Sequence, residues 1–426
     1  MLSREDNELV TRVGPGTPAG MLFRRYWIPA VQSNELEADG APVRVEILGE
    51  ELAAFRDTEG RVGLLREFCP HRGVSLVLAR NEECGLRCLY HGWKFDVTGR
   101  CVDLPTEPAG SEFIHKVKAR AYKTVEAGGV VWAYMGPPEK KPAPPEVEWC
   151  VLPESHRYVT KRLQETSYLQ AMEGGIDTSH VSWVHRYEVD KDPMHKHSKA
   201  LEYIKKDSNV VFDIEEMPHG LTMYGRRLGG EDTHYWRITQ WIFPWFTLIP
   251  PFGPHALGGH VWVPIDDENC WAWSINWLAD RPLPKEELDA MKDGRGIHVK
   301  YVPGTFTPLA NKGNDWLIDR AAQKNRESFS GVDGFSIQDA SLQESMGPIQ
   351  NHAAEHLIAT DKAIVMARRM LERAARDLAQ GIEPPALDPA AQRVRAASVL
   401  LDRRINAPEW ARTALFDGLE QPVFSI

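Results

Sequence analysis

The sequence predicts an α+β fold in two domains, an all-β domain followed by a domain that contains both helices and strands. Three observations support this prediction. The 426 residues are too many for one ordinary hydrophobic core. Short apolar runs separated by turn residues occupy residues 45–65 and 119–136. Beyond a proline-rich stretch, a helical pattern and two runs rich in aromatic and β-branched residues occur together.

The all-β domain is predicted from residues 45–65 and 119–136, where apolar runs alternate with Gly, Asp and Glu turn signals. Residues 135–149, MGPPEKKPAPPEVEW, contain five prolines and no helical or strand periodicity. We therefore expect an extended connector there. The predicted division is an N-terminal segment (1–24), a first domain (25–140), a second domain (141–385) and a C-terminal extension (386–426).

The second domain is predicted from one helical segment, two strand-rich segments and one later helix. Residues 163–186 indicate helix despite a Gly pair, whereas residues 234–250 and 260–278 are rich in strand formers. Near the end of the chain, Thr360 is the expected N-cap of a helix that Gly381 terminates. The apolar positions of this helix are Ile364, Met370, Leu371 and Leu378. We expect it to pack on the sheet.

The composition excludes several classes of protein. Net charge is −10 and the basic residues are scattered, which argues against a nucleic-acid partner. No apolar stretch approaches the roughly 20 residues that span a bilayer, and the start MLSREDNELV lacks the apolar core of a signal peptide, so a cytoplasmic location is expected. Six cysteines are too few for a disulfide scaffold. Cys101, Cys150 and Cys270 are interpreted as buried apolar residues.

Two short motifs predict a metal cluster in the first domain. The segment CPHRGVSLVLARNEECGLRCLYHGW places Cys69 and His71 on one loop, and Cys88 and His91 on a second loop after sixteen residues. Each loop offers one thiolate and one imidazole. A Rieske [2Fe-2S] centre needs this set, because two thiolates hold one iron and two histidines hold the other.

The alternative for these four residues is a structural zinc site, which also accepts two Cys and two His. Zinc fingers usually pair cysteine with cysteine, whereas both pairs here are mixed. Gly73 and Gly92 follow the two motifs closely, as tight loops require. Cys84 competes with Cys88 as a ligand, but only Cys88 repeats the mixed pair with a histidine.

CPHRG and CLYHGWKFD resemble the cluster-binding loops of Rieske ring-hydroxylating oxygenases. The opening TRVGPGTPAGMLFRRYWIPA and the distal ESMGPI resemble the phthalate dioxygenase branch, which includes chlorobenzoate and phenoxybenzoate dioxygenases and dehydrodivanillate O-demethylase. This resemblance spans roughly residues 8–375. It implies an all-β Rieske domain and a helix-grip (START-like) catalytic domain with a curved antiparallel sheet and a long C-terminal helix. It also places Trp93 beneath the second cluster loop.

The segment EGGIDTSHVSWVH supplies candidates for a second metal site. His180 and His185 are five residues apart, near enough on a helix or helix end to meet one ion, and Asp177 precedes them. Two imidazoles and one carboxylate leave open positions on Fe(II) for dioxygen and substrate. The segment resembles the family's Asp-x-x-His-x4-His motif. In that family the aspartate is no ligand, and Asp177 would be an electron-transfer bridge to His91 of a neighbouring subunit.

The resemblance also indicates the third ligand of a mononuclear Fe(II). In IQDASLQESMGPIQ, residues 337–350, an aspartate precedes a glutamate by five, and Asp339 is the expected ligand, with Asp333 and Glu344 as alternatives. One departure is Glu173, which stands where the family often has asparagine, so the hydrogen bonding there is open.

His195 and His197 form an additional His-x-His pair in a charged loop that contains proline. We expect both histidines to be exposed to solvent rather than to bind a metal.

The resemblance favours an aromatic carboxylate as substrate. A carboxylate in an apolar pocket needs a charged partner, and arginine offers a planar two-point contact. Arg226 and Arg237 are the preferred candidates and Arg227 is a third. The expected apolar walls are Trp236, Trp241 and Trp245. The product is either a cis-dihydrodiol or a hydroxylated methyl ether that collapses to a phenol and formaldehyde.

The resemblance further implies partners and an assembly. O2 would be the co-substrate, and electrons would come from a separate NADH-dependent reductase with flavin and [2Fe-2S], directly or through a ferredoxin. No nucleotide-binding glycine motif follows a predicted strand in this chain. Members of the branch form homotrimers or stacked trimers. The competing functions are an electron carrier fused to a non-catalytic binding domain and a zinc-stabilised binding protein.

Overall fold

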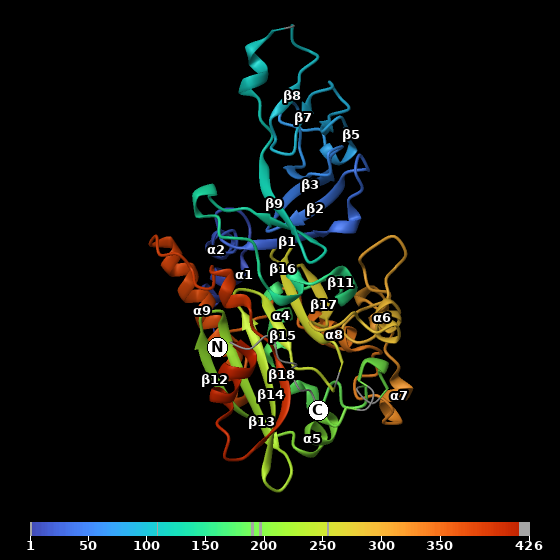
Figure 1. Ribbon diagram of the computed structural model, residues 1–426, viewed down its shortest axis with the longest axis vertical. Helices are drawn as coiled ribbons and strands as arrows, with labels where there is room; N and C mark the ends of the chain where they lie inside the picture. Colours follow the sequence, from blue (N-terminus) through green and yellow to red (C-terminus); the bar gives the residue numbers. More distant parts are fainter. Residues whose placement is uncertain (1, 109, 189–190, 196–197, 254, 417–426) are drawn as a thin grey trace. The chain divides into compact units, whose positions relative to one another are not determined.

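The computed structural model describes residues 2–416 except 109, 189–190, 196–197 and 254 (Figure 1). The chain forms two compact units, residues 13–145 and residues 1–12 together with 146–426. The second unit therefore takes its first helix from the start of the chain. The division into 1–24, 25–140, 141–385 and 386–426 remains a prediction about folding domains.

The unit of residues 13–145 is built from antiparallel strands, as predicted. Six strands form one sheet, in the order β1 (Trp27–Gln32), β10 (Val130–Tyr134), β9 (Ala121–Ala127), β4 (Val62–Arg66), β3 (Glu50–Arg56) and β2 (Val43–Ile47). Four short strands form the other, in the order β5 (Arg80–Glu82), β6 (Gly85–Arg87), β7 (Lys94–Phe95) and β8 (Cys101–Asp103). Helix α2 (Pro18–Phe23) precedes β1.

The proline-rich connector is free of strands over residues 135–149, as expected, and it contains one 3-10 turn at Pro138–Lys140. It leads into the short helix α3 (Glu148–Val151).

The larger unit contains an antiparallel sheet that includes both predicted strand-rich segments. Its main path runs through β11 (Arg157–Gln164), β17 (Cys270–Trp277), β16 (Leu257–Pro264), β15 (Phe246–Ile249), β14 (Thr233–Ile242), β13 (Gly220–Leu228) and β12 (Val211–Met217). β15 pairs with the last residues of β14, from Gln240 to Ile242. The remaining edge of β14 pairs with β18 (Ala397–Asp402). The segment predicted as an extension thus completes the sheet.

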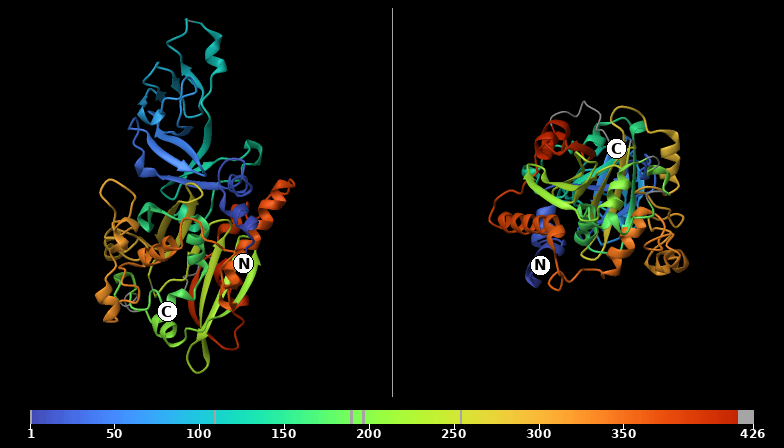
Figure 2. Two further views of the ribbon diagram at one scale, coloured as in Figure 1. Left: turned by 180° about the vertical axis from the view of Figure 1, so that it is seen from behind. Right: turned by 90° about the horizontal axis from the view of Figure 1, so that it is seen from below.

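Helices of the larger unit pack around this sheet, as Figures 1 and 2 show for α9. α4 (Tyr168–Ile176) contacts β15, β16 and α8 (Phe335–Ser345). α9 (Lys362–Ala379) contacts β13, α4 and α1 (Arg4–Thr11). Further described helices of this unit, besides α3, are α5 (Ala200–Lys206), α6 (Lys285–Lys292), α7 (Arg320–Lys324) and α10 (Ala407–Ala411). No helix in the described part of the chain is long and apolar enough to cross a membrane.

The two predicted helices differ from the observed ones at their ends. The segment 163–186 is helical only over α4 and a 3-10 turn at His180–Ser182, because Asp177 takes an extended conformation with ψ 99°. The long helix begins at Lys362 after Asp361 rather than after Thr360. Gly381 has φ 85° beyond its last turn, as predicted for its terminator. The three unassigned cysteines, Cys101, Cys150 and Cys270, are buried as predicted.

The Gly pair inside α4 is explained by packing. A Cβ built on Gly175 would lie 2.4 Å from Cη2 of Trp262 and 2.7 Å from Oγ1 of Thr247, both on the sheet. A Cβ on Gly174 would lie 2.1 Å from Nε2 of Gln343, the flexible end of a side chain on α8. Glycine lets α4 approach the sheet and α8 closely, although it weakens the isolated helix.

Gly175→Ala should therefore destabilise the protein by about 1–3 kcal/mol through overpacking, although alanine alone favours helix by roughly 0.5–1 kcal/mol. Gly174→Ala should cost less, because the Gln343 amide can move. Thermal unfolding of both variants checks this order. An increase in Tm for Gly175→Ala would contradict the packing argument.

A buried ion pair ties the segment before the last strand to the end of the connector. Nε of Arg395 donates to Oε2 of Glu148 over 2.9 Å, and the two side chains are 3% and 8% exposed. Nε1 of Trp277 donates to the same carboxylate over 2.9 Å. Two residues earlier, Arg393 pairs with Glu146 at the surface, where the side chains are 56% and 34% exposed. The chain thus carries a buried pair and an exposed pair between the same two segments.

Arg395→Met should lower the free energy of unfolding by about 3–5 kcal/mol, because Glu148 would remain buried without its partner. Arg393→Met is the matched control and should cost at most about 1 kcal/mol, since exposed pairs contribute little. Urea unfolding followed by tryptophan fluorescence measures both. Equal losses of unfolding free energy in the two variants would show that burial does not determine how much each ion pair contributes.

Candidate functional site

The first group of candidate ligands lies on two loops that close in the same way. In each loop the cysteine N–H donates to the carbonyl five residues later, and a glycine four residues later donates to the cysteine carbonyl, over 2.9 to 3.0 Å. The pairs are Cys69 with Gly73 and Cys88 with Gly92. Both glycines have φ 74°, which side chains with a Cβ rarely adopt. The prediction that tight loops require these glycines is confirmed.

The four predicted cluster residues lie on these loops. The rings of His71 and His91 have centroids 4.5 Å apart, and the Cys69 thiol interacts with that of Cys88. Burial raises the pKa of the Cys69 thiol to about 11, although N–H groups of the loop donate to its sulfur. Nδ1 of His91 is buried and has no hydrogen-bond partner among the described residues. Two interacting buried thiols, two imidazole rings in contact and a buried ring nitrogen without a partner fit a metal cluster, whose charge would stabilise the thiolates.

Trp93 supports the same loops. Its ring stacks on His71 with centroids 4.2 Å apart and an interplanar angle of 10°, and its Nε1 donates to Oγ1 of Thr106 over 2.9 Å. Cys84, the competing cysteine, lies in the turn between β5 and β6, where its N–H donates to Oγ1 of Thr58.

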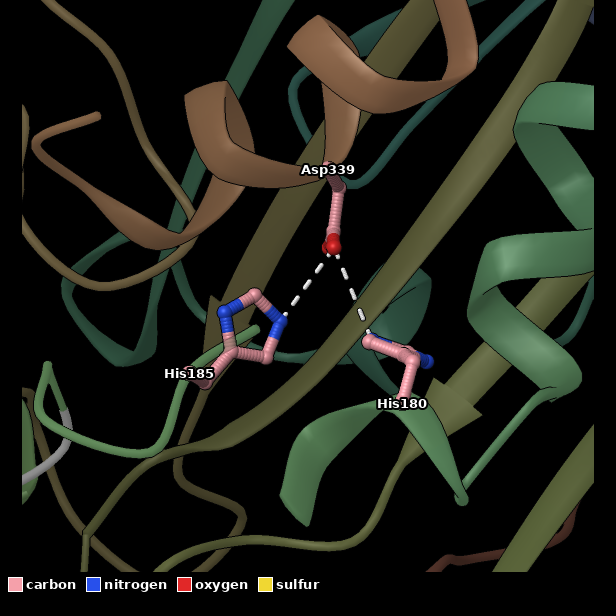
Figure 3. A group of neighbouring side chains, drawn as sticks. All are labelled: His180, His185 and Asp339. Carbon is pink, nitrogen blue, oxygen red and sulfur yellow. Dashed lines mark ion pairs between the residues drawn. The ribbon is translucent and has the colours of Figure 1, made fainter. Parts of the chain in front are cut away.

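The second group brings together His180, His185 and Asp339, from the segment after α4 and from α8 (Figure 3). Oδ1 of Asp339 lies 3.5 Å from Nε2 of His180 and 3.2 Å from Nε2 of His185. Metal bonds to nitrogen and oxygen of about 2.1 Å place neighbouring ligand atoms about 3 Å apart. Both histidine nitrogens thus lie at about this distance from the carboxylate oxygen, and donor atoms of the three residues lie within 4.8 Å of one another, close enough to bind one ion.

The electrostatics of this group favour a cation. Burial alone would raise the pKa of Asp339, but His185 and His180 lower it to about 2. Burial alone would lower the pKa of His180, but Asp177 and Asp339 raise it to about 9. The point where the donors meet thus stabilises positive charge, and a divalent metal ion would supply that charge.

Asp177 contacts the outer side of this group. Its Oδ2 lies 3.5 Å from Nδ1 of His180, the nitrogen that faces away from Asp339, and its Oδ1 accepts from the N–H of Ser179 over 2.7 Å. Burial would raise the pKa of Asp177, but the contact with His180 lowers it. Asp177 is thus held as a carboxylate behind one candidate ligand.

Arg227, one of the three arginines considered as substrate-binding residues, binds the segment that leads to His180. Its Nη2 donates to the carbonyl of Thr178 over 2.9 Å, and its Nε donates to the carbonyl of Asp207 over 3.1 Å. The side chain is buried, and burial lowers its pKa to about 10. Arg227 therefore anchors the turn that precedes His180.

The two alternative acidic ligands lie elsewhere. Asp333 is 79% exposed and pairs with Arg295 at 3.3 Å. Oε2 of Glu344 accepts from Nε1 of Trp316 over 2.6 Å. Among Asp333, Asp339 and Glu344, the acidic residues considered from the sequence, it is Asp339 that lies beside the two histidines.

The structure explains Glu173 at the family's asparagine position. Arg368 on α9 donates from Nε and Nη2 to the two Glu173 oxygens over 2.6 and 2.7 Å, and its Nη1 donates to Glu355 over 2.6 Å. Glu173, Glu355 and the buried His352 also have the composition of a metal site. Arg368 already supplies the positive charge there, so this cluster ties α4 to α9.

A cavity of about 110 Å³ lies beside the three donors. An engineered cavity of about 150 Å³ holds benzene, so this space is of the order of one aromatic ring. Its apolar lining includes Val181, Met194, Ile249, Phe252, Trp262 and Phe335. Its polar lining includes Arg162, His195, Arg237, His260 and Asn276.

Strand alternation separates the predicted arginines. Arg237 lines the cavity, and its register partner Gly225 shares its face of the sheet. Arg226 is paired with Trp236, which packs in a separate apolar cluster with Ile238. Arg226 is absent from the cavity lining that the described residues form. The prediction that Arg226 binds substrate therefore has no support from its position.

The predicted aromatic walls were wrong. Trp236, Trp241 and Trp245 are buried in the larger unit, but the cavity lining within the described part of the chain does not include them. Trp241 lies beneath α4, where its Nε1 donates to the sulfur of Met172 over 3.1 Å. The aromatic walls are formed instead by Phe252, Phe335 and Trp262.

His195 is not in a solvent-exposed loop as expected. Its ring packs against Phe252 and Phe335, with centroids 4.9 and 4.6 Å away, and burial lowers its pKa to about 3. His197 lies outside the described residues. Arg162 and His260, which also line the cavity, carried no motif by which the sequence could identify them.

Comparisons with known proteins agree with both halves of this description. Residues 26–124 match the Rieske [2Fe-2S] domain family. Residues 133–401, more than half of the chain, match the family described as LigXa C-terminal domain like.

Three curated relatives cover most of the chain. The 3-chlorobenzoate-3,4-dioxygenase oxygenase subunit of Comamonas testosteroni is 40% identical, over 92% of this chain and 93% of the relative. The phthalate 4,5-dioxygenase oxygenase subunit of Pseudomonas putida is 36% identical, over 87% and 85%. The 5,5'-dehydrodivanillate O-demethylase oxygenase subunit of Sphingobium sp. (strain NBRC 103272 / SYK-6) is 29% identical, over 98% and 89%.

A solved structure shares the fold. Dicamba monooxygenase bound to dicamba has a TM-score of 0.61 and 18% identity, over 84% of this chain and 98% of that one. The family matches exclude both a zinc-stabilised binding protein and an electron carrier with a non-catalytic second domain. The chain belongs to the Rieske non-haem iron oxygenases, as an oxygenase subunit of the phthalate dioxygenase branch that carries a [2Fe-2S] cluster and a mononuclear iron.

Proposed function

We propose that Cys69, His71, Cys88 and His91 hold the [2Fe-2S] cluster and that His180, His185 and Asp339 hold the mononuclear Fe(II). The second assignment is supported by Oδ1 of Asp339, which lies within 3.5 Å of Nε2 of His180 and of Nε2 of His185. Two imidazoles and one carboxylate are the ligands of non-haem Fe(II) oxygenases, and they leave positions free. When bound, the cluster supplies electrons and the mononuclear iron supplies the chemistry of dioxygen.

Anaerobically purified wild-type protein should contain three irons and two acid-labile sulfides per subunit, because a [2Fe-2S] cluster and one further iron are present together. His180→Ala should contain two irons and two sulfides, since it removes one proposed ligand of the mononuclear site only. Iron and sulfide analysis measures both. Two irons in the wild type after reconstitution, unchanged in the variant, would overturn the second assignment.

The proposed reaction is hydroxylation of an aromatic carboxylate, and the observation that carries the substrate class is Arg237. Its side chain is 2% exposed and lines the cavity beside the three donors. Nη2 donates to the carbonyl of Pro250 over 3.0 Å, whereas Nε and Nη1 have no partner among the described residues. The guanidinium carbon lies 4.3 Å from the centroid of Phe252.

A buried guanidinium with N–H groups left without acceptors is costly unless an anion neutralises it. A substrate carboxylate can accept from both groups in the two-point geometry that arginine favours. The apolar walls of Phe252, Phe335 and Trp262 would hold the ring and keep water away. The substrate class also agrees with the names of the chlorobenzoate and phthalate relatives.

Both proposed outcomes consume one O2, two electrons and two protons. In ring dihydroxylation both oxygen atoms remain in a cis-dihydrodiol. In O-demethylation one oxygen atom leaves as water and the other yields a hydroxylated methyl ether, which collapses to a phenol and formaldehyde. Relatives of both kinds align with the chain.

Arg237→Gln should raise KM for 3-chlorobenzoate or phthalate by about 10- to 100-fold, because charge-assisted hydrogen bonds are worth about 1.5–3 kcal/mol. Arg226→Gln is the matched control from the neighbouring strand and should change KM by less than about threefold. Substrate-dependent O2 uptake with a phthalate dioxygenase reductase provides the assay, and uncharged chlorobenzene tests the need for a carboxylate. A KM unaffected by Arg237→Gln would refute this arginine as the anchor.

The proposed partners are a separate NADH-dependent reductase with flavin and [2Fe-2S], acting directly or through a ferredoxin, and other copies of this chain in a homotrimer or stacked trimers. The names of the relatives, which are oxygenase subunits, support the separate reductase. We propose Asp177 as the electron-transfer bridge, since its carboxylate lies 3.5 Å from Nδ1 of His180. All six cysteines are free of disulfides, which agrees with the proposed cytoplasmic location.

A further inference from the structure

Gln338, the residue before Asp339 on α8, contacts His185 on the side away from the proposed iron. Oε1 of Gln338 lies 2.7 Å from Nδ1 of His185. Nε2 of Gln338 donates to the carbonyl of Val332 over 2.9 Å and lies 3.5 Å from Oε2 of Glu188. Gln338 and His185 are 1% and 4% exposed. The amide is therefore buried and contacts groups on both sides.

The contact with Val332 determines which end of the amide faces His185. A backbone carbonyl can only accept, so the amide NH2 must point to Val332. Oε1 then points to the imidazole, and since Oε1 can only accept, Nδ1 of His185 must carry the hydrogen. In a neutral imidazole the other nitrogen, Nε2, then has the free lone pair. That is the nitrogen 3.2 Å from Oδ1 of Asp339.

We propose that Gln338 is a positioning residue that holds His185 in the Nδ1–H tautomer, with the Nε2 lone pair available to the mononuclear iron. The inference rests on the proposed function, because it takes His185 as an iron ligand. Histidines that bind metals usually donate their other N–H to a carboxylate, a carbonyl or water, which fixes the tautomer and the ring orientation. Here a side-chain amide takes that role.

One turn of α8 thus holds the imidazole of His185 from three directions. Phe335 packs on the ring with centroids 4.7 Å apart, Gln338 accepts from Nδ1, and Asp339 faces Nε2. His180 differs, because its Nδ1 lies 3.5 Å from the carboxylate of Asp177. The two proposed histidine ligands therefore have unlike supports, a neutral amide for His185 and an anion for His180.

A neutral support suits the charges already present. Asp339 and Asp177 are carboxylates within 3.5 Å of the histidines, and Glu188 lies behind Gln338. A carboxylate at position 338 would add another negative charge to a buried region, whereas an amide fixes the tautomer without one. The amide also keeps a donor for the Val332 carbonyl.

The test uses Co(II) as a probe, because cobalt is distinguished from the cluster iron by elemental analysis. The mononuclear iron is removed with a chelator while the visible absorption of the cluster is retained, and Co(II) binding is measured by equilibrium dialysis. Gln338→Leu and Gln338→Asn should weaken Co(II) binding by about 10- to 100-fold, the usual effect of losing such a support. Gln338→Glu should bind Co(II) more tightly than Gln338→Leu, because its carboxylate still accepts from Nδ1, but less tightly than wild type, because it loses the donor to the Val332 carbonyl and adds a buried negative charge.

Gln240→Leu is the matched control. Gln240 is also a buried amide bound to an imidazole, with Oε1 3.0 Å from Nε2 of His219, and it is absent from the described lining of the cavity. Its replacement should leave Co(II) binding within about threefold of wild type. Circular dichroism and Tm establish that each variant is folded. If Gln338→Leu does not fold, Gln338→Asn takes its place in the test.

Wild-type affinity in folded Gln338→Leu or Gln338→Asn would overturn the inference, as would Gln338→Glu binding as weakly as Gln338→Leu. His185→Ala separates this failure from failure of the proposed function. If His185→Ala binds Co(II) like wild type, the ligand assignment itself is wrong. If His185→Ala loses binding while Gln338→Leu and Gln338→Asn keep it, only the role of Gln338 is rejected.

Discussion

The close approach of α4 to α8 is the constraint on which the catalytic unit depends. The two histidines follow α4 and the aspartate belongs to α8, so the distance between these helices sets whether three donor atoms can meet. Gly174 leaves room between them for the amide of Gln343. Gln343 then fills the interface, its Oε1 accepting from Gln164 over 2.6 Å and its carbonyl accepting from Gln170 over 3.2 Å. These hydrogen bonds, together with the glycine at position 174, keep the proposed ligands close enough to bind one ion.

Buried ion pairs extend this constraint to the ends of the chain. Arg368 joins α9 to Glu173 on α4, and Arg395 joins the segment before β18 to Glu148. Each arginine is almost fully buried and bound by carboxylates, so neither can rotate away without exposing an unpaired charge. Arg237 and Arg162 differ from these two, because both line the cavity, both are buried, and two N–H-bearing nitrogens of each lack partners among the described residues. This difference is consistent with the proposed role of Arg237 in binding the substrate.

The sequence predicted those features that local spacing determines. The cluster loops, the strand-rich segments and the end of α9 at Gly381 follow from patterns within a few residues. Predicting Asp339 as a ligand required the family resemblance, because Asp339 is far along the chain from the two histidines and no local sequence pattern connects them. Arg162, His195 and His260 could not be found, since they come from β11, a 3-10 turn and β16 and meet only when the chain folds back. The prediction that the tryptophans line the cavity failed for a related reason. Aromatic side chains on a strand can contact α4, as Trp241 does, or a separate apolar cluster, as Trp236 does, and the sequence alone does not show which.

The pairing of β18 with β14 has a consequence for the order of events during synthesis. The chain emerges from the ribosome N-terminus first, and domains generally fold as units. Residues 13–145 form a continuous unit, so the loops with Cys69 and Cys88 can close early. The larger unit needs α1 from the start of the chain and β18 from near its end. This unit, which holds the proposed iron ligands, can therefore be completed only after β18 has been synthesised, later than the residues that form the cluster loops.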